Sequence, residues 1–329
     1  MIYSRNRRLR VNESIRSLVR ETVLTPSDFV MPMFVMEGEN NMEAIPSMPG
    51  IFRRTIDLTV KECKELFNVG VKAVNLYMKV PENLKDNTGK EAWNPDGLMQ
   101  RTIKAIKDAL PEMIVMPDVA LDPYSIYGHD GIIENGKIVN DATVDALARM
   151  SVSLAEAGCD VVAPSDMMDG RVLGIREALE EAGHTDVGIL SYAAKYASSF
   201  YGPFRSALDS APKEAGNIPL DKKTYQMDFH NSREAMNEVF KDVEEGADII
   251  MIKPGLPYLD IVAKVREAID LPIAVYNVSG EYAMLKAAVQ NGWLENDKAI
   301  IESLTCIKRA GADMIFTYAA KEAAEILNQ

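Results

Sequence analysis

The sequence predicts an α/β fold, namely a (β/α)8 barrel of the TIM type with an extended N-terminal arm. Short apolar runs alternate with helix-like segments along the 329 residues, and one glycine-containing junction recurs where a helix-like segment leads into the next run. A doubly wound open sheet is the alternative. It is disfavoured because no Gly-x-Gly-x-x-Gly follows the first apolar run and the chain contains no Walker loop.

Eight apolar runs are candidate strands, and they recur at fairly regular intervals. They cover residues 29–35, 73–78, 113–119, 160–163, 187–190, 248–252, 272–278 and 313–317. Helix-like segments separate most of them, including residues 143–157, 231–244, 259–268 and 297–309. Alternation of this kind is typical of repeated βα units.

The junction between a helix-like segment and the next strand has the same pattern four times. Its glycines are Gly70, Gly158, Gly246 and Gly311, and three of the four junctions end in aspartate. Glycine is the expected residue for the left-handed turn that ends a helix. The repeat therefore marks one βα unit.

Composition excludes several classes of protein. The chain has 36 basic and 49 acidic residues and a net charge of −13, which argues against a nucleic-acid surface over the whole molecule. No run approaches the ~18 apolar residues of a membrane span, and the first twenty residues lack a secretory signal, so we expect a soluble, cytoplasmic protein. Three widely spaced cysteines, Cys63, Cys159 and Cys306, favour neither a disulfide framework nor a zinc–thiolate site.

Residues 1–25 form the predicted arm, and residues 26–329 form one barrel domain. Six arginines in the first twenty residues face only Glu13 in that stretch, with Glu21 following directly. The arm could bind anions. On an acidic protein, contact with a neighbouring subunit is the commoner explanation, and we predict that role.

The active site of a barrel lies at the C-terminal ends of its strands. Lys253 ends one apolar run before Pro254 and Gly255, and Lys195 comes just past the end of the run 187–190. Burial would lower a lysine pKa from its usual ~10.4 and leave more of the nucleophilic amine. A single such lysine could equally reach solvent or form a salt bridge. The polar residues at the strand ends are Asp118, Ser165, Lys195, Lys253, Ser279 and Tyr318.

Long loops follow three strands, at residues 78–97, 122–141 and 201–230. Loops of this length without secondary structure are usually lids or binding loops. Asn135-Gly136 predicts a small hairpin inside the second loop. The third, which we call the lid (residues 201–230), brings cationic and amide groups suited to carboxylates, namely Arg205, Lys222, Lys223 and Gln226.

Two strand-end lysines under a cationic lid favour Schiff-base chemistry on keto acids. Two lysines suggest two carbonyl substrates, and their mutual repulsion would lower at least one pKa. Asp118 could transfer a proton, orient a substrate amine or simply cap a loop. The alternatives are a single-lysine class I aldolase, in which Lys195 is structural, and a barrel that serves as a non-catalytic scaffold.

Four motifs resemble the porphobilinogen synthase family, also called 5-aminolevulinic acid dehydratase, and the resemblance runs from the arm to Tyr318. They are Ile252-Lys253-Pro254-Gly255, the run from Ala163-Pro164-Ser165 to Gly170-Arg171, Phe200-Tyr201-Gly202-Pro203-Phe204-Arg205, and Val278-Ser279-Gly280-Glu281-Tyr282. The resemblance implies condensation of two 5-aminolevulinate molecules into porphobilinogen with loss of two waters, in tetrapyrrole (haem and chlorophyll) biosynthesis.

The resemblance also implies a role for each site residue. Lys253 resembles the Schiff-base lysine of the propionate-side substrate, and Lys195 that of the acetate-side substrate. The propionate-side carboxylate would be bound by Ser279 and Tyr318, and the other carboxylate by Arg205, Lys222 and Gln226. Asp118 and Ser165 would lie in the acetate-side pocket, and Phe204 would also contact substrate.

Zinc-using members of the family carry three cysteines in the loop after the third strand, where this chain has Ala120, Asp122 and Asp130. Carboxylates favour harder ions such as Mg²⁺, so we expect no catalytic Zn²⁺. Asp122 and Asp130 could hold an active-site ion or act as hydrogen-bonding groups without metal. The chain resembles the magnesium-responsive branch, in which Glu238 matches an allosteric Mg²⁺ ligand at a subunit interface.

The family forms homo-octamers whose N-terminal arms wrap neighbouring subunits. The resemblance therefore implies a homo-octamer here as well. An interface Mg²⁺ would bind the assembled form preferentially and shift the population toward it.

Overall fold

A computed structural model of the chain describes residues 3–208 and 210–329. Residues 1 and 2 of the predicted arm and residue 209 of the lid lie outside this range. Eight parallel strands form a ring: β1 (Phe29–Val35), β4 (Ala73–Met78), β5 (Ile114–Val119), β8 (Val161–Pro164), β9 (Gly188–Lys195), β10 (Ile249–Lys253), β11 (Ile273–Asn277) and β12 (Met314–Thr317). Because β12 pairs with β1, the ring is closed, which confirms the barrel over the open sheet.

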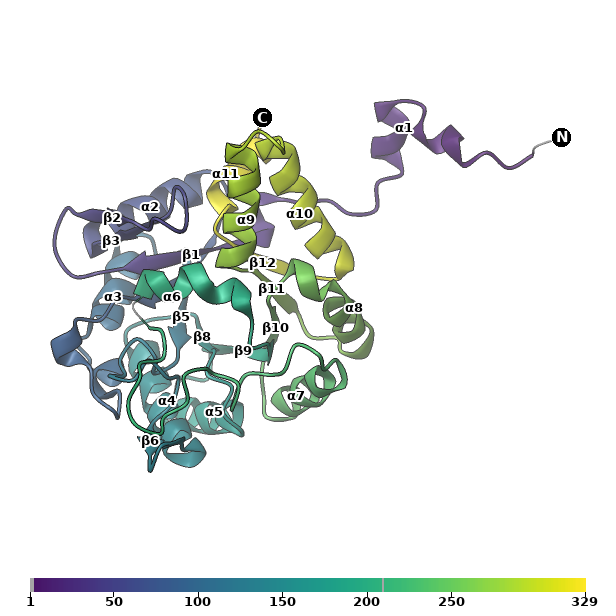
Figure 1. The fold of residues 1–329 in the computed structure, drawn as a ribbon. Coiled ribbons are helices and arrows are strands. Elements are labelled where there is room, and N and C mark those ends of the chain that lie inside the picture. Colours follow the sequence, from purple (N-terminus) through teal and green to yellow (C-terminus); the bar gives the residue numbers. More distant parts are fainter. Residues whose placement is uncertain (1–2, 209) are drawn as a thin grey trace.

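Helices surround the barrel (Figure 1). They are α2 (Ile56–Asn68), α3 (Leu98–Ala109), α4 (Asn140–Glu156), α5 (Arg171–Glu181), α7 (Arg233–Glu244), α8 (Leu259–Ala268), α9 (Ser279–Gln290), α10 (Asn296–Ala310) and α11 (Ala320–Leu327). The four helices predicted by residue range are confirmed within a few residues. Short 3₁₀ turns η2 (Pro26–Asp28), η3 (Glu82–Leu84), η4 (Lys90–Trp93) and η6 (Leu256–Tyr258) lie in the connections.

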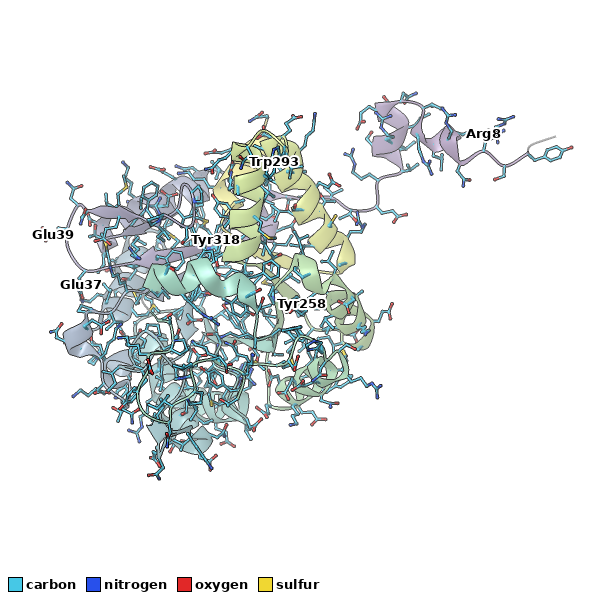
Figure 2. The ribbon with its side chains drawn as sticks, viewed as in Figure 1. Arg8, Glu37, Glu39, Tyr258, Trp293 and Tyr318 are labelled. Atoms are coloured by element: carbon cyan, nitrogen blue, oxygen red, sulfur yellow. The ribbon has the colours of Figure 1, made fainter. Side chains whose placement is uncertain are left out.

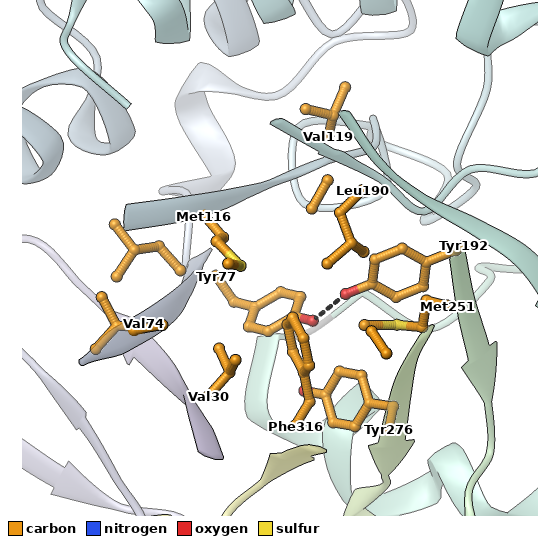
Figure 3. Close-up of a cluster of buried hydrophobic side chains, with 14 of the residues drawn as sticks. Val30, Val74, Tyr77, Met116, Val119, Leu190, Tyr192, Met251, Tyr276 and Phe316 are labelled. Atoms are coloured by element: carbon orange, nitrogen blue, oxygen red, sulfur yellow. Dashed lines mark hydrogen bonds between the residues drawn. The ribbon is translucent and has the colours of Figure 1, made fainter. Parts of the chain in front are cut away.

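The barrel interior is packed with side chains from all around the ring. Figure 3 shows Tyr77, Tyr192, Tyr276 and Phe316 meeting there, with the hydroxyls of Tyr77 and Tyr192 2.9 Å apart. All four are almost fully buried. The interior is therefore a core, and a site can form only at its mouth.

The four junction glycines have the left-handed backbone that their pattern predicts. Their φ angles are +97° at Gly70, +99° at Gly158 and Gly246, and +125° at Gly311. These are angles that residues with a Cβ rarely adopt. The same left-handed turn leads from a helix to the next strand at all four junctions, which confirms the βα repeat.

Strand β9 is longer than the sequence indicated, so the placement of Lys195 past the end of a strand was wrong. The strand continues through Tyr192, Ala193 and Ala194, and its last residue is Lys195. Pairing with β10 extends it, because Ala194 lies opposite Ile252 and Lys195 lies opposite Lys253. Both lysines are therefore the final residues of neighbouring strands.

The lid contains more regular structure than expected. The 3₁₀ turn η5 (Ser199–Tyr201) ends at the first residue of the lid, and helix α6 (Gly202–Leu208) follows, with Pro203 at an early position that tolerates proline. The prediction of a lid without secondary structure was therefore wrong for its first part. The predicted hairpin is confirmed as β6 (Ile133–Glu134) and β7 (Lys137–Ile138), with Asn135 and Gly136 at φ +51° and +74°.

Two segments lie outside the ring. Strands β2 (Met42–Ala44) and β3 (Phe52–Arg54) form an antiparallel pair that joins β1. At the N-terminus, η1 (Asn6–Arg10) and α1 (Glu13–Leu18) stand away from the barrel (Figures 1 and 2, the latter labelling Arg8). Among the described residues, no helix has both the length and the apolar character needed to cross a membrane.

Candidate active site

Lys195 and Lys253 lie side by side at the C-terminal mouth of the barrel. The register of β9 and β10 makes them directly opposite residues, and each residue is only 6% exposed. Both line one cavity beneath the lid, which we call the large cavity to distinguish it from a smaller neighbour. The convergence predicted for the two lysines is confirmed.

Aromatic rings surround the amine of Lys253. Its Nζ lies 4.3 Å from the ring centroid of Tyr276, and three further rings have centroids between 5.1 and 5.3 Å away, those of Tyr192, Tyr201 and Phe204. We call these four rings the aromatic pocket. Burial, together with the charge of Lys195, lowers the pKa of Lys253 to about 7. A large fraction of this amine is therefore neutral and nucleophilic at neutral pH.

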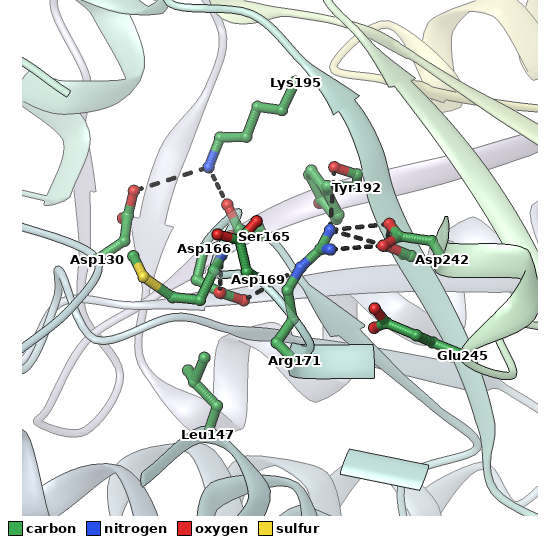
Figure 4. A network of polar contacts seen from close by, with 12 residues as sticks. Asp130, Leu147, Ser165, Asp166, Asp169, Arg171, Tyr192, Lys195, Asp242 and Glu245 are labelled. Atoms are coloured by element: carbon green, nitrogen blue, oxygen red, sulfur yellow. Dashed lines mark hydrogen bonds and ion pairs between the residues drawn. The ribbon is translucent and has the colours of Figure 1, made fainter. Parts of the chain in front are cut away.

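Polar groups surround the amine of Lys195 instead. Its Nζ donates to the backbone carbonyl of Ser165 and lies 4.0 Å from Oδ2 of Asp130 (Figure 4). Asp118 and Asp122 line the same cavity, and we call these three aspartates the carboxylate pocket. The two lysines thus share one cavity and the ring of Tyr192, whose centroid is 5.8 Å from the Lys195 amine, but their other neighbours differ.

The three carboxylates of this pocket have different proton affinities. Burial and the nearby charge of Asp122 raise the pKa of Asp118 to about 7, so Asp118 can both give and take a proton at neutral pH. Burial also raises the pKa of Asp122. Burial acts in the same direction on Asp130, but Lys222 and Lys195 outweigh it and lower its pKa to about 2.

Lys222 ties the lid to the carboxylate pocket. Its Nζ lies 3.2 Å from Oδ2 of Asp122 and 2.9 Å from Oδ1 of Asp130, and all three side chains are buried. An ammonium group thus occupies the position between the two proposed metal ligands. Within residues 3–208 and 210–329, no three His, Cys, Asp or Glu side chains are grouped to hold a metal ion. The residues here do not fit an active-site metal.

A second, small cavity adjoins the first at Lys253. Lys253, Tyr201 and Phe204 line both cavities, and the remaining walls of the small one are Tyr276, Val278, Ser279 and Tyr318. Ser279 begins helix α9, and its Oγ accepts a hydrogen bond from the Phe204 amide at 3.0 Å. Hydroxyls at a helix N-terminus suit a carboxylate.

Several described polar atoms of the large cavity are buried without a hydrogen-bond partner. Among the described residues, Asp118 Oδ1, Gln226 Oε1 and the Ser210 hydroxyl are buried without a hydrogen-bond partner. Arg205 of α6 lines the same space. Buried polar groups are almost always paired in proteins, so a polar ligand would complete this cavity.

The structure brings together every predicted site residue except Glu238 and Lys223. The prediction that Lys223 lies over the mouth was wrong, because its side chain is exposed and pairs with Asp221. The sequence did not reveal the aromatic pocket, because Tyr192, Tyr201 and Tyr276 come from three separate segments. A signal existed only for Tyr201, which lies inside the motif of residues 200–205. The pairing of Lys222 with Asp122 and Asp130 was also missed.

Behind Lys195, a buried arginine supports the segment that carries Ser165. Arg171 Nη1 donates to Asp242 Oδ1 at 2.6 Å, and its Nε lies 4.0 Å from Asp166 Oδ2 (Figure 4). Because Asp242 belongs to α7, this ion pair fixes α7 against the Ser165 segment. Breaking a buried pair of this kind by removing one partner costs ~3–5 kcal/mol.

Glu238 is on the same helix but faces a different cavity. It is half-buried, and burial raises its pKa. Glu234 and Asp169 line that cavity with it, so several carboxylate oxygens border one space. Mg²⁺ commonly binds through one or two carboxylates and keeps several waters, so Glu238 could hold such an ion, although no three of the described acidic side chains are grouped here around one point.

Comparisons with known proteins cover nearly the whole chain. Residues 3–326 match the family model described as delta-aminolevulinic acid dehydratase. The chloroplastic delta-aminolevulinic acid dehydratase of Chlamydomonas reinhardtii is 53% identical, with 98% of this chain and 84% of that protein covered. The Bradyrhizobium diazoefficiens enzyme of that name is 50% identical, over 98% and 90%. A crystal structure of the Toxoplasma gondii enzyme with its product porphobilinogen superposes with a TM-score of 0.95 at 52% identity, over 98% of this chain and 91% of that one.

Proposed function

The chain belongs to the delta-aminolevulinic acid dehydratase family, and we infer that it condenses two 5-aminolevulinate molecules into porphobilinogen. Two waters are lost, and the reaction is that of a lyase in tetrapyrrole biosynthesis. One observation in the structure supports this conclusion most directly. Lys195 and Lys253 are opposite residues on neighbouring strands, so two amines can each bind one carbonyl substrate in the same mouth.

We propose that each lysine forms an imine with the ketone of one substrate. Each amine attacks a carbonyl carbon, and the carbonyl oxygen leaves as water, so two imines account for both waters. The new carbon–carbon and carbon–nitrogen bonds form by addition to the two imine carbons, and each lysine then leaves as an amine by elimination as the adduct loses a proton. Lys253 is suited to the attack because its surroundings favour the neutral amine.

We propose that the two cavities hold the two substrates. The propionate-side molecule would occupy the small cavity, with its carboxylate at Ser279 and Tyr318 and its chain against Phe204. The acetate-side molecule would occupy the large cavity beside Asp118 and Ser165, with its carboxylate under Arg205, Lys222 and Gln226. Lys222 already pairs with Asp122 and Asp130. We therefore propose that Arg205 neutralises most of the charge of the substrate carboxylate.

We propose Asp118 as the group that moves protons in the acetate-side pocket. Its pKa of about 7 matches a neutral working pH, and the unpartnered Oδ1 is available to a substrate amine. Removing a proton from the substrate carbon requires such a base near the imine. Asp118 lines the cavity shared by both lysines, which supports this role.

Magnesium and assembly are further parts of the proposal. Glu238 would hold an allosteric Mg²⁺, and no catalytic Zn²⁺ is assigned because the three loop positions carry Ala120, Asp122 and Asp130. Residues 1–25 would contact a neighbouring subunit in a homo-octamer. Apolar side chains on the arm support this contact, since Tyr3, Leu9 and Leu18 are 79%, 56% and 83% exposed.

Product analysis tests the proposed function. The purified chain is incubated with 5-aminolevulinate, and the products are identified by mass spectrometry and NMR. We expect porphobilinogen, in a ratio of one product to two substrates consumed. Failure to consume substrate, or cleavage of an aldol instead, would contradict the proposed function. It would favour the scaffold or the aldolase interpretation of the two lysines.

A further inference from the structure

A buried carboxylate lies behind Lys253 and has no part in the proposed chemistry. Glu281, in the first turn of α9, is only 3% exposed. Its Oε2 accepts hydrogen bonds from the amides of Gly255 at 3.1 Å and Val278 at 2.8 Å. Its Oε1 accepts from the amide of Leu256 at 2.6 Å and from the side chain of Asn277 at 3.2 Å.

Helix capping explains only one of these four hydrogen bonds. A glutamate at the third helical position commonly bonds the backbone amide that precedes the helix, here that of Val278. The amides of Gly255 and Leu256 belong to a different connection, the one that directly follows Lys253. Hydrogen bonds to a carboxylate are stronger than neutral ones, so Glu281 binds the end of β10 to the end of β11.

The hydrogen bonds continue to a third strand. Asn277 Oδ1 accepts from the Thr317 hydroxyl at 3.1 Å, and that hydroxyl accepts from the amide of Ala319 at 3.2 Å. These two residues flank Tyr318. One connected network thus spans the ends of β10, β11 and β12, which carry Lys253, Ser279 and Tyr318.

Close packing holds the connection after Lys253 against this carboxylate. A Cβ added at Gly255 would lie 3.0 Å from the carbonyl oxygen of Tyr276 and 3.3 Å from Oε1 of Glu281. Both contacts are tighter than ordinary van der Waals packing. A side chain at residue 255 would therefore displace the carbonyl of Tyr276 or the carboxylate of Glu281 by a few tenths of an ångström.

We propose that Glu281 is a positioning residue that fixes the amine of Lys253 relative to Ser279 and Tyr318. It acts through the backbone and does not touch substrate. The inference rests on the proposed role of Lys253 as an imine-forming residue. Lys195 is held by other groups, the Ser165 carbonyl and Asp130, so loss of Glu281 affects the two lysines unequally.

Imine trapping at the two lysines tests this asymmetry. The probe is 4-oxopentanoate, which has the ketone and carboxylate of the substrate but no amine and so cannot complete the condensation. Borohydride reduces each imine to a stable amine, and peptide mass spectrometry measures the trapping rate at Lys195 and Lys253 separately. Glu281→Gln keeps the size of the side chain but replaces one carboxylate oxygen by an NH₂ group. That group cannot accept a hydrogen bond from a backbone N–H.

We expect Glu281→Gln to slow trapping at Lys253 by about 100-fold, the effect of displacing a reacting group by ~1 Å, with only a small change at Lys195. Gly255→Ala retains the carboxylate but displaces the same connection, and it should show the same inequality. The control is Glu322→Gln, which removes a carboxylate paired with Lys286 outside the mouth and should trap like wild type.

Two results would overturn the inference: unchanged trapping at Lys253, or equal losses at both lysines in the two variants. Equal losses would mean that Glu281 contributes only to general stability. Absence of trapping at both lysines in the wild-type chain would instead overturn the proposed function, and this inference with it.

Discussion

The aromatic pocket and the carboxylate pocket give two identical side chains different chemistry. Lys253 faces four rings, whereas Lys195, the residue opposite it in the sheet, faces a backbone carbonyl and carboxylates. The rings come from β9, β11 and the lid, and the carboxylates come from β5 and the loop that follows it. Position in the barrel thus brings the two amines together, while their neighbours from other segments distinguish them.

This difference suggests a division of labour between the two halves of the site. Desolvation among rings yields a neutral amine in one half. In the other half, carboxylates with raised and lowered pKa values can accept protons and hold charge. The following experiments test this contrast and the site around it, in order of decreasing expected effect.

The largest expected effect is loss of either lysine. Lys253→Ala and Lys195→Ala should each lower kcat for porphobilinogen formation by at least about 10⁴-fold, because both imines are required. Lys298→Ala, at an exposed ion pair with Glu295, serves as the control. Retention of carbonyl chemistry in Lys195→Ala would make the carboxylate pocket structural and favour the aldolase alternative.

The second change neutralises Asp118. Asp118→Asn keeps the shape of the side chain but cannot take up a proton, so kcat should fall by about 10²–10⁴-fold, the range for loss of a general acid or base. Steady-state kinetics on porphobilinogen formation would measure it. An unchanged kcat would indicate that Asp118 only caps its loop.

The sequence predicted the barrel and the meeting of the lysines because both depend on local patterns. Apolar runs and junction glycines mark each βα unit, and parallel strands bring their ends together without any knowledge of side-chain contacts. The aromatic pocket depends on contacts between residues far apart in sequence. No pattern in the sequence around Tyr276 predicts that its ring lies over Lys253.

The same limit applies to ion pairs and additions to the barrel. Lys222 was assigned to a substrate carboxylate, yet it meets Asp122 and Asp130, which are separated from it by about a hundred residues. Strands β2 and β3 went unpredicted because they are short and depend on pairing with β1. The length of β9 likewise depends on its partner β10.

The third change removes the cation of the carboxylate pocket. Lys222→Met leaves the buried carboxylate of Asp122 without its ion-pair partner and Asp130 with only Lys195, at 4.0 Å, so it should lower the free energy of unfolding by about 3–5 kcal/mol. Lys223→Met, at an exposed pair with Asp221, should change it little. Thermal unfolding of both variants would measure the difference, and equal melting temperatures would show that the buried pairs contribute no net stability.

The stability that these ion pairs give the wild-type chain should decrease at acidic pH. The pKa of Asp130 is lowered to about 2, so its pairing stabilises the fold fully above the unfolded value of ~3.9, and this contribution is lost as the pH falls through about 2. Without Lys222, the pKa of Asp130 rises toward the unfolded value, so the stability that is lost on acidification becomes smaller. Unfolding curves for Lys222→Met and wild type between neutral and acidic pH would show this weaker dependence on pH.

The smallest effect is expected from magnesium. Metal-stripped enzyme should be stimulated by Mg²⁺ a few-fold, and Glu238→Gln should bring the ratio of activities with and without Mg²⁺ close to one. Glu244→Gln, at an exposed position of the same helix, should keep the stimulation. Equal stimulation of Glu238→Gln and wild type would remove Glu238 from the metal site.

The most direct test of the contrast between the pockets is the pH dependence of imine formation at Lys253. Trapping of 4-oxopentanoate with borohydride is measured at this residue across the neutral and alkaline range. Because the ammonium cannot attack a carbonyl, the rate should rise with pH and reach half its maximum near pH 7. A midpoint near the ordinary lysine value of ~10.4 would contradict the account, since the aromatic pocket would then not favour the neutral amine.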